Sequence, residues 1–433
     1  MADEDRHLDL PRGFHDCDPD TAAAYQALRS DWFAACALAG YQPVEVPPVG
    51  FRDTFTHGHH AAGNRLYPLT DRCGRQLALV SDSLPALLRL ARARRLPAQR
   101  LSYCCPVFRY VRRPRRYFHQ LGLMEVASGP ADLAAQHRSV RRLARIMATF
   151  LVPRLPVRFT VTDPGLWREV IGFAQIREPA ALLNEIRRHL PSQRAALLRA
   201  AGYPAVSVRL AQVLADSPDW DGQDINCVLP ECPSSLRERL RSARLLAGAI
   251  RDCGATADVD LTELHASEFH NGPAFQIKPE QGRLLGDGGT YDAFAAAFLG
   301  TETAAYSAIV GLERLVDLQG QIRTSTAADV AVIAHPDTAS TAHADTLTDL
   351  LRSLDIRVWD LVQTHRLDRH LRDLAALGIP FVVVIGEREL HAEVYIVRNA
   401  TGGLHEVPQR HLSSWLTEPP SVPRPATARR AAR

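Results

Sequence analysis

The sequence predicts an α+β protein in which a large first domain precedes a small α/β domain. At 433 residues, of which 46% are hydrophobic, the chain is too long for one small domain and can bury a substantial core. Strand and helix patterns are mixed up to about residue 320, and a mostly helical stretch at 176–251 interrupts the strands like an inserted module. Strands and helices alternate after residue 320, which is typical of a small α/β domain with a mixed sheet.

Apolar periodicity and turn residues predict the elements of the first domain, residues 1–320. Helices are expected at 20–40, 82–95, 131–151, within 176–251, at 291–299 and from Leu312 onward. Strands are expected at 41–49, 76–80, 107–110, 121–127, 257–261, 273–278 and 306–311. The first of these strands approaches Pro47 and Pro48, which cannot donate backbone hydrogen bonds and therefore mark an edge or an end.

The second domain is predicted to span residues 326–416. Strands are expected at 329–334, 357–360, 381–385 and 393–398, with helices at 341–353 and 366–377. Residues 417–433 are rich in proline, alanine and arginine and have little to bury, so we predict a disordered tail.

Composition excludes several classes of function. No apolar run approaches the roughly 20 residues of a membrane span, and the polar amino terminus lacks a signal peptide, so we predict a cytoplasmic protein with no membrane partner. None of the eight cysteines forms a Cys-x-x-Cys pair, which disfavours a structural metal site and predicts reduced thiols. Net charge is only +3, but all basic residues except Lys278 are arginines, which bind phosphate and carboxylate bidentately.

The most informative segment runs from Phe108 to Gly122, where five arginines fall within residues 109–116. A solvated basic loop is the ordinary interpretation of such a run. Here the flanking apolar strands predict a hairpin that projects the arginines from a sheet, an arrangement suited to polyphosphate or nucleic acid.

This segment resembles motif 2 of class II aminoacyl-tRNA synthetases of the histidyl type. Other pieces resemble the same family in the same order along residues 11–412. They are Pro11-Arg12-Gly13-Phe14-His15-Asp16, a motif 1-like stretch from Gly40 to Pro47, Gly288-Gly289-Thr290-Tyr291-Asp292, the motif 3-like Gly311-Leu312-Glu313-Arg314-Leu315, and a terminal domain similar to the family's anticodon-binding domain. Each piece alone is weak, but the ordered set is specific.

The resemblance implies an antiparallel class II catalytic sheet, a helical insertion, a homodimer, and chemistry in which ATP with Mg²⁺ activates a carboxylate as an acyl-adenylate. It assigns catalysis to Arg109, at the α-phosphate and the carboxylate, and to Arg314, at the ATP tail. Glu313 joins these two as an ATP-binding residue. The resemblance assigns substrate binding to four further residues. They are Asp82, Gln120, His270 and Tyr291.

The sequence departs from the family where the family contacts its substrates. Val111 replaces a glutamate at the adenine end, and the motif 2 loop, which reaches the tRNA acceptor in the family, is about three residues shorter. The family's Arg-Pro-Glu-Gly-Thr, which binds the α-ammonium group, corresponds to Val80-Ser81-Asp82-Ser83-Leu84. The catalytic arginine and the imidazole-binding tyrosine of the family's histidine-specific segment correspond to His265 and His270.

A further departure lies on the strand after the motif 2 loop. The acid expected four places after Gln120 is Met124, and Glu125 comes one place late. Because side chains alternate along a strand, Glu125 should face away from the pocket.

Three hypotheses follow from these observations. The first is a synthetase paralogue that activates an amino acid other than histidine, or another small carboxylate, for transfer to an amine or a tRNA. The second is a non-catalytic regulator resembling the regulatory subunit of ATP phosphoribosyltransferase, although such subunits usually lack the motif 3 arginine and the terminal domain. The third is a genuine histidine–tRNA ligase with unusual pocket residues.

Overall fold

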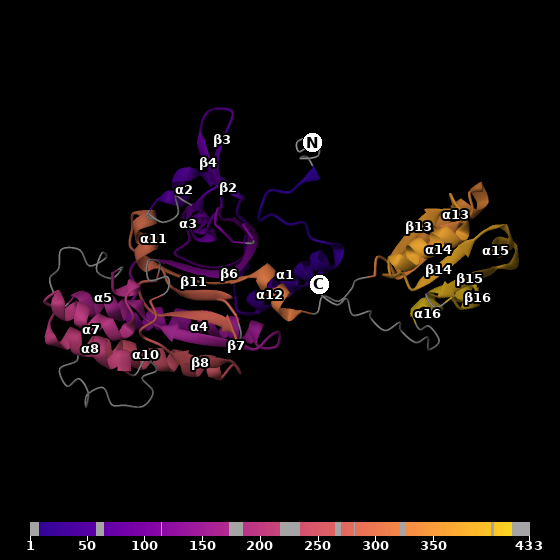
Figure 1. Cartoon of the computed structure of the whole chain (residues 1–433). Coiled ribbons are helices and arrows are strands. Elements are labelled where there is room, and N and C mark those ends of the chain that lie inside the picture. Colours follow the sequence, from indigo (N-terminus) through magenta and orange to yellow (C-terminus); the bar gives the residue numbers. More distant parts are fainter. Residues whose placement is uncertain are drawn as a thin grey trace, which may run out of the picture. The chain divides into compact units, whose positions relative to one another are not determined.

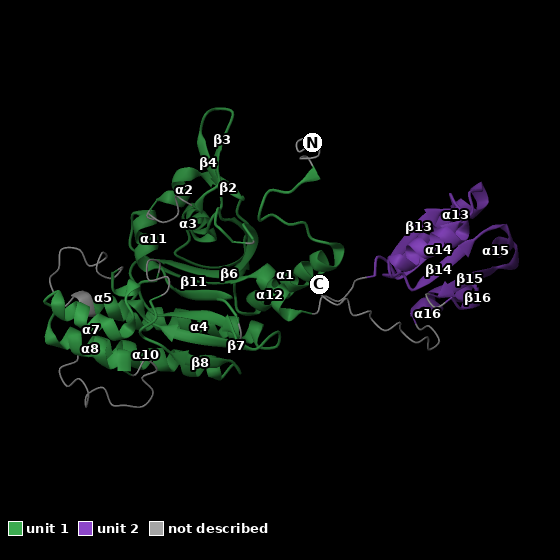
Figure 2. Ribbon diagram, viewed as in Figure 1, with its two compact units in different colours: residues 1–322 green, residues 323–433 purple. Residues whose placement is uncertain are grey.

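The chain folds into two compact units, residues 1–322 and 323–433, each described here by itself (Figure 2). The computed structural model describes residues 8–57, 65–113, 115–172, 185–216, 234–264, 270–280, 282–320, 326–399 and 402–417. The predicted disordered tail therefore lies outside the described residues apart from Thr417. The functional domain limits of 1–320 and 326–416 stay predictions.

Unit 1 is built on an eight-stranded sheet in the order β1-β5-β6-β11-β10-β9-β7-β8. Figure 1 labels β6, β11, β7 and β8 of this sheet. Its strands are β1 (Gln42–Pro43), β5 (Ala98–Phe108), β6 (Tyr117–Ser128), β7 (Val157–Thr162), β8 (Thr256–Val259), β9 (Ala274–Pro279), β10 (Gly286–Thr290) and β11 (Thr303–Gly311). Only the outer pairs, β1 with β5 and β7 with β8, are parallel, and the other neighbours are antiparallel. The predicted α+β class with a large antiparallel sheet is confirmed.

Helices and a small second sheet complete the described part of unit 1. The helices are α1 (Pro19–Leu38), α2 (Arg52–Thr56), α3 (Ser83–Arg94), α4 (Leu133–Leu151), α5 (Pro164–Gly172), α7 (Pro191–Ala200), α8 (Ala205–Asp216), α10 (Ser234–Arg251), α11 (Asp292–Leu299) and α12 (Leu312–Gln319). The small sheet has the order β2-β4-β3, with β2 (Val49–Phe51), β3 (Pro68–Thr70) and β4 (Gln76–Leu79). No described helix has the length and apolarity to span a membrane.

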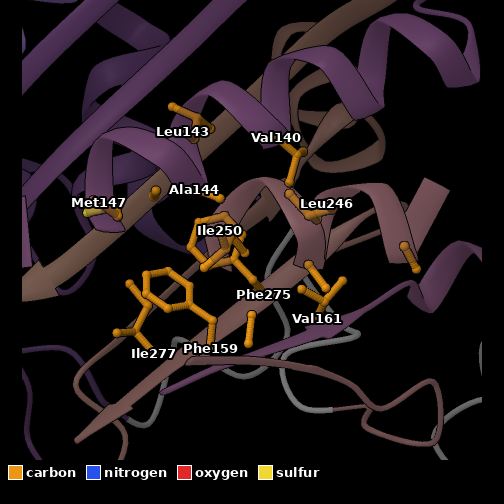
Figure 3. Packing of buried hydrophobic residues seen from close by; sticks show 14 of the residues in the cluster. Val140, Leu143, Ala144, Met147, Phe159, Val161, Leu246, Ile250, Phe275 and Ile277 are labelled. Carbon is orange, nitrogen blue, oxygen red and sulfur yellow. The ribbon is translucent and has the colours of Figure 1, made fainter. Parts of the chain in front are cut away.

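Alternation along the central strands gives the large sheet two different faces. Phe275 and Ile277 of β9 point into an apolar core shared with α4 and α10, as Figure 3 shows. Gln276, the intervening residue, pairs with Asp287 of β10 on the opposite face. That opposite face is covered in part by α3 and α11, whose buried side chains form a second apolar cluster with Tyr103, Met124 and others. The space that these helices leave over the sheet is where the cavity described below lies.

Three differences from the predicted elements have identifiable physical causes. The strand expected at 41–49 is wrong, since β1 ends at Pro43 and the chain is irregular until Val49; Pro43, Pro47 and Pro48 remove the donors that a longer ladder needs. The motif 2 strands are longer than predicted, because β5 and β6 pair over their full lengths. β10 was not predicted, because Gly-Asp-Gly-Gly-Thr contains little that favours a strand on its own.

Unit 2 is a small α/β domain with the sheet order β13-β12-β14-β15-β16. Its elements are β12 (Val330–Ala334), α13 (Thr338–Ser353), β13 (Val358–Val362), α14 (Leu367–Ala376), β14 (Phe381–Ile385), α15 (Glu387–Ala392), β15 (Val394–Asn399), β16 (Leu404–Pro408), η3 (Gln409–His411) and α16 (Leu412–Thr417). The sheet is mixed, as predicted, because β12, β13 and β14 run parallel whereas β15 and β16 run antiparallel.

Candidate active site

A cavity of about 750 Å³ lies on the sheet face opposite α4 and α10. Its wall combines residues from the sheet, the start of α3, the motif 2 loop and the helical insertion. They are Phe55, Arg65, Ser81, Asp82, Ser83, Leu84, Pro85, Tyr103, Arg109, Arg113, Arg187, Arg194, Glu263, Leu264, His270, Arg283, Leu284, Asp287, Tyr291, Ser307, Ile309 and Arg314.

The charges of this wall are unbalanced. Seven arginines face three carboxylates, those of Asp82, Glu263 and Asp287. The described residues of the wall therefore carry four more positive than negative charges, and a concave site of one sign concentrates ligands of the other sign. Guanidinium groups also match the geometry of phosphate oxygens. The arrangement suits a polyphosphate.

Arg109 follows β5 and is held firmly in the cavity wall. Its Nε donates to the backbone oxygen of Ser81 at 2.8 Å, and its Nη2 donates to Oδ2 of Asp82 at 3.2 Å. The guanidinium carbon lies 5.4 Å from the ring centre of Phe118, within cation–π range. These contacts fix the orientation of the group and leave part of it exposed to the cavity.

Arg314 reaches the same cavity from the first turn of α12. Its Nη1 donates to the backbone oxygen of Leu284, and none of the described carboxylates forms an ion pair with it. Burial, and then the neighbouring Arg283 and Arg113, lower the pKa of Arg314. Arginine nevertheless stays charged in proteins. An unpaired guanidinium beside two others is an electrostatic setting that a bound anion would stabilise.

The other arginines of the motif 2 loop have different surroundings. Arg113 lines the cavity, whereas Arg115 pairs with Asp317 at 3.2 Å and the Arg116 guanidinium stacks 4.6 Å from the ring centre of Tyr110. The loop is therefore divided between cavity-facing and structurally engaged arginines.

Two predicted site residues lie behind the cavity wall. Gln120 is buried and accepts a hydrogen bond from Ser83 Oγ at 2.9 Å. Glu313 is buried, accepts from the backbone N–H of His119 at 2.8 Å and lies 2.7 Å from His119 Nδ1. Neither residue is part of the cavity lining, so direct contact of Gln120 with substrate and of Glu313 with ATP stays a prediction.

Asp82, His270 and Tyr291, the other predicted substrate-binding residues, do line the cavity. Asp82 is the N-cap of α3, with Oδ1 accepting from Leu84 N–H at 3.0 Å. The rings of His270 and Tyr291 pack 4.7 Å apart. Burial, followed by the Asp287 and Asp82 charges, raises the pKa of Tyr291 well above its usual value, so the phenol stays a hydrogen-bond donor.

Asp287 of β10 is a cavity residue that the sequence analysis missed. Removal from water, together with the neighbouring Asp82 charge, raises its pKa to about 6, while Arg109 acts in the opposite direction. In the sequence, Asp287 is marked only by its place directly before the family-like Gly288-Gly289-Thr290-Tyr291-Asp292. That place does not indicate the face of the sheet on which its side chain lies.

The departures from the family pattern that the structure describes lie in different places. Val80, Leu84 and Met124 belong to the buried apolar cluster beside the cavity. Glu125 faces away from the cavity, as the strand alternation predicted, and binds Tyr41 Oη and the Arg142 guanidinium near the opposite face. His265 lies outside the described residues.

The comparison with known families decides the relationship. A family model described as histidyl-tRNA synthetase matches residues 13–315, and one described as anticodon-binding domain matches residues 329–418. The chain belongs to the histidyl-tRNA synthetase family. The predicted resemblance is thereby confirmed, and the cavity lies within the part that matches the synthetase model.

Relatives within and around the histidyl-tRNA synthetase family carry two different names. A histidine–tRNA ligase of Dehalococcoides mccartyi is 23% identical over 414 residues, which are 90% of this chain and 94% of that protein. An ATP phosphoribosyltransferase regulatory subunit of Moorella thermoacetica is 27% identical over 363 residues, 77% of this chain and 87% of that protein. Sequence identity at this level does not choose between a ligase and a regulator.

Solved structures share the fold. Histidyl-tRNA synthetase from Nostoc sp. PCC 7120 superposes with a TM-score of 0.75 at 17% identity, covering 95% of this chain and 99% of that one. A protein from Bacillus halodurans C, titled as an ATP phosphoribosyltransferase regulatory subunit/histidyl-tRNA synthetase, gives a TM-score of 0.70 at 16% identity, covering 84% of this chain and 96% of that one.

Proposed function

We propose that this chain binds ATP and activates the carboxylate of an amino acid other than histidine as an acyl-adenylate. The observation that carries the proposal is the cavity that Arg109 and Arg314 share with five further arginines. A substrate carboxylate oxygen would bond to the α-phosphorus as the bond to the pyrophosphate oxygen breaks, and pyrophosphate would leave with that electron pair. Negative charge grows on the phosphoryl oxygens in the transition state, where fixed guanidinium groups stabilise it.

The two arginines would have different roles in this reaction. Arg109 is oriented by Ser81 and Asp82, so it can hold the α-phosphate and the attacking carboxylate without reorganising. Arg314, which has no carboxylate partner among the described residues, would hold the distal phosphates.

Magnesium enters such a site with the nucleotide, because it is bound mainly by phosphate oxygens, water and one or two carboxylates. The described residues contain no group of three histidine, cysteine or acidic side chains placed to hold a metal, which fits an ion that ATP itself brings.

The residues expected to contact the amino acid support a substrate other than histidine. Met124, which is buried in the apolar cluster, stands where the family pattern has an acidic residue, and Leu84 stands where it has a threonine. A site that recognises imidazole needs matched polar partners, because an unmatched buried polar group costs about 1–3 kcal/mol. The acceptor of the acyl group is proposed to be a tRNA or an amine, and the match of residues 329–418 to an anticodon-binding domain supports tRNA.

A regulatory role is the second candidate. The observation that favours it is the Moorella thermoacetica regulatory subunit, which is 27% identical to this chain. A homodimer, a cytoplasmic location and, as a third candidate, genuine histidine–tRNA ligase activity are predictions that rest on the family.

Pyrophosphate exchange tests the proposal. Purified protein with ATP, Mg²⁺ and each standard amino acid in turn should exchange labelled pyrophosphate into ATP with at least one acid other than histidine. Exchange with none of them, while ATP binds by calorimetry, would favour the regulatory role.

A further inference from the structure

One row of paired residues crosses the sheet beneath the cavity. On neighbouring strands, the residues paired in this row are, in order, Tyr103 (β5), Gly122 (β6), Ile309 (β11), Asp287 (β10) and Gln276 (β9). Tyr103, Ile309 and Asp287 all line the cavity. Asp287 is the one carboxylate in this row, and a central strand of the sheet holds it rigidly.

The two carboxylates at this end of the cavity differ in their hydrogen bonding. Both oxygens of Asp82 are engaged within the chain, Oδ1 by the backbone N–H of Leu84 and Oδ2 by the Arg109 guanidinium. Within the described part of the chain, the carboxylate of Asp287 receives no hydrogen bond and forms no ion pair. Asp82, at the position of the family's usual ammonium ligand, thus already accepts two hydrogen bonds within the chain, whereas Asp287 accepts none from the described residues.

An ionised carboxylate removed from water needs a cationic or hydrogen-bonding partner. Arg109 is close enough to act on Asp287 electrostatically, but its Nε and Nη2 bond to Ser81 and Asp82, and it forms no hydrogen bond with Asp287. The phenol of Tyr291, which lies at the same end of the cavity, offers one neutral donor. A ligand ammonium group would supply the directly bonded cationic partner that Asp287 lacks among the described residues.

We propose that Asp287 binds an ammonium group of the activated acid, so that the substrate is an amino acid or another amine-bearing carboxylate and not a simple carboxylic acid. The inference rests on the proposed function and deepens it, because it assigns the ammonium end of the substrate to a specificity-determining residue. The carboxylate end of the same ligand would then face Arg109, on the side where the nucleotide phosphates are expected.

Calorimetric binding tests this assignment without requiring turnover. Each standard amino acid is titrated into the full-length protein, with and without saturating α,β-methylene-ATP, whose α,β-bridge cannot be cleaved by adenylation. The amino acid that binds best is then compared with its deamino analogue. We expect the analogue to bind at least about tenfold more weakly, since a hydrogen bond to a charged group is lost.

Variants separate the role of Asp287 from a general structural effect. Asp287→Asn keeps the shape and should bind the amino acid at least about tenfold more weakly, with an unchanged melting profile or a higher one. Asp287→Glu should recover part of the affinity. Asp258→Asn, an exposed acid paired with Arg158 outside the cavity, is the matched control and should bind like the unaltered chain.

Each alternative outcome contradicts a specific statement. Equal binding of the amino acid and its deamino analogue, or unchanged affinity in Asp287→Asn, would overturn the role of Asp287. Binding of nucleotide with no amino acid bound would overturn it as well. Absence of nucleotide binding would overturn the proposed function, and the titration without nucleotide would still decide whether Asp287 takes an ammonium group.

Discussion

The Arg109 guanidinium and the Asp82 carboxylate form an ion pair, with 3.2 Å between Nη2 and Oδ2, in the wall of the arginine-rich cavity. Their side chains are 28% and 38% exposed, so a ligand can reach both groups. The pair joins the two substrates of the proposed reaction, because Asp82, the N-cap of α3, stands at a position expected to contact the amino acid and Arg109 is proposed to hold the α-phosphate.

Replacing Arg109 by alanine should weaken ATP binding at least about tenfold, since each charge-assisted contact to phosphate contributes roughly 1.5–3 kcal/mol. Isothermal calorimetry with ATP and Mg²⁺ measures the change. Arg158→Ala is the control, because Arg158 also pairs with an aspartate, Asp258, but lies outside the cavity. Equal ATP affinity in Arg109→Ala and the unaltered chain would rule out the phosphate role.

Asp287→Asn should stabilise the protein at neutral pH. The folded chain holds the Asp287 proton up to a pKa of about 6, whereas the unfolded chain loses it near 3.8. Ionisation of Asp287 therefore lowers the free energy of unfolding as pH rises from about 4 to 6. Above that range the free energy of unfolding of Asp287→Asn should exceed that of the unaltered chain by up to about 3 kcal/mol.

The pH dependence of the stability difference between Asp287→Asn and the unaltered chain identifies Asp287 as the titrating group. Below about pH 3 the difference should vanish, because Asp287 is then largely protonated in both the folded and the unfolded chain. The other titratable groups that face it, Asp82, Arg109, Tyr291 and His270, are present in both proteins. Thermal unfolding between pH 4 and 8 measures this difference, and a gap that does not change with pH would contradict the account.

Gly122→Ala should destabilise unit 1 by roughly 1–3 kcal/mol, because an added methyl group would strike the Tyr103 ring on the paired strand. Tyr103 lines the cavity, so substrate affinity should fall as well. Gly248→Ala is the control. Gly248 lies in α10 with no atom within 4 Å of the added Cβ, and alanine there should be neutral or stabilising by up to about 1 kcal/mol. Chemical denaturation of both variants would show the opposite signs, and equal behaviour would refute the packing argument.

The chain is predicted to be a dimer through the motif 1-like stretch near Val44 to Pro47. The structure places the short strand β1 at one edge of the eight-stranded sheet, directly before this stretch. Sedimentation velocity at micromolar concentration should give twice the mass of one chain. Sedimentation as a monomer would remove the dimer from the account.

Local sequence patterns predicted the elements that local interactions define. Helices α1, α3 and α4 each begin after an aspartate whose carboxylate caps the first turn, and apolar periodicity marks their buried sides. The strands of the second domain were predicted by runs such as Phe381–Ile385. Local chemistry was sufficient for these elements.

Elements and contacts that depend on distant pairing could not be predicted in the same way. β10 is a strand because β9 and β11 pair with it on both sides, not because its glycines favour extended structure. Asp287 reaches the cavity for the same reason. Likewise, only the fold shows that Gln120 and Glu313 are engaged by Ser83 and His119 behind the wall.

Histidine-dependent pyrophosphate exchange, followed by charging of histidine tRNA, tests the central claim most directly. Arg109 and Arg314, which we propose to bind the phosphates, are retained, while the residues expected to contact the amino acid differ from the family pattern at Leu84, Met124 and His270. Free histidine should therefore support little exchange. Another amine-bearing acid should support more exchange with the same protein and ATP. Efficient turnover of histidine in both assays would contradict the account and identify the chain as a histidine–tRNA ligase.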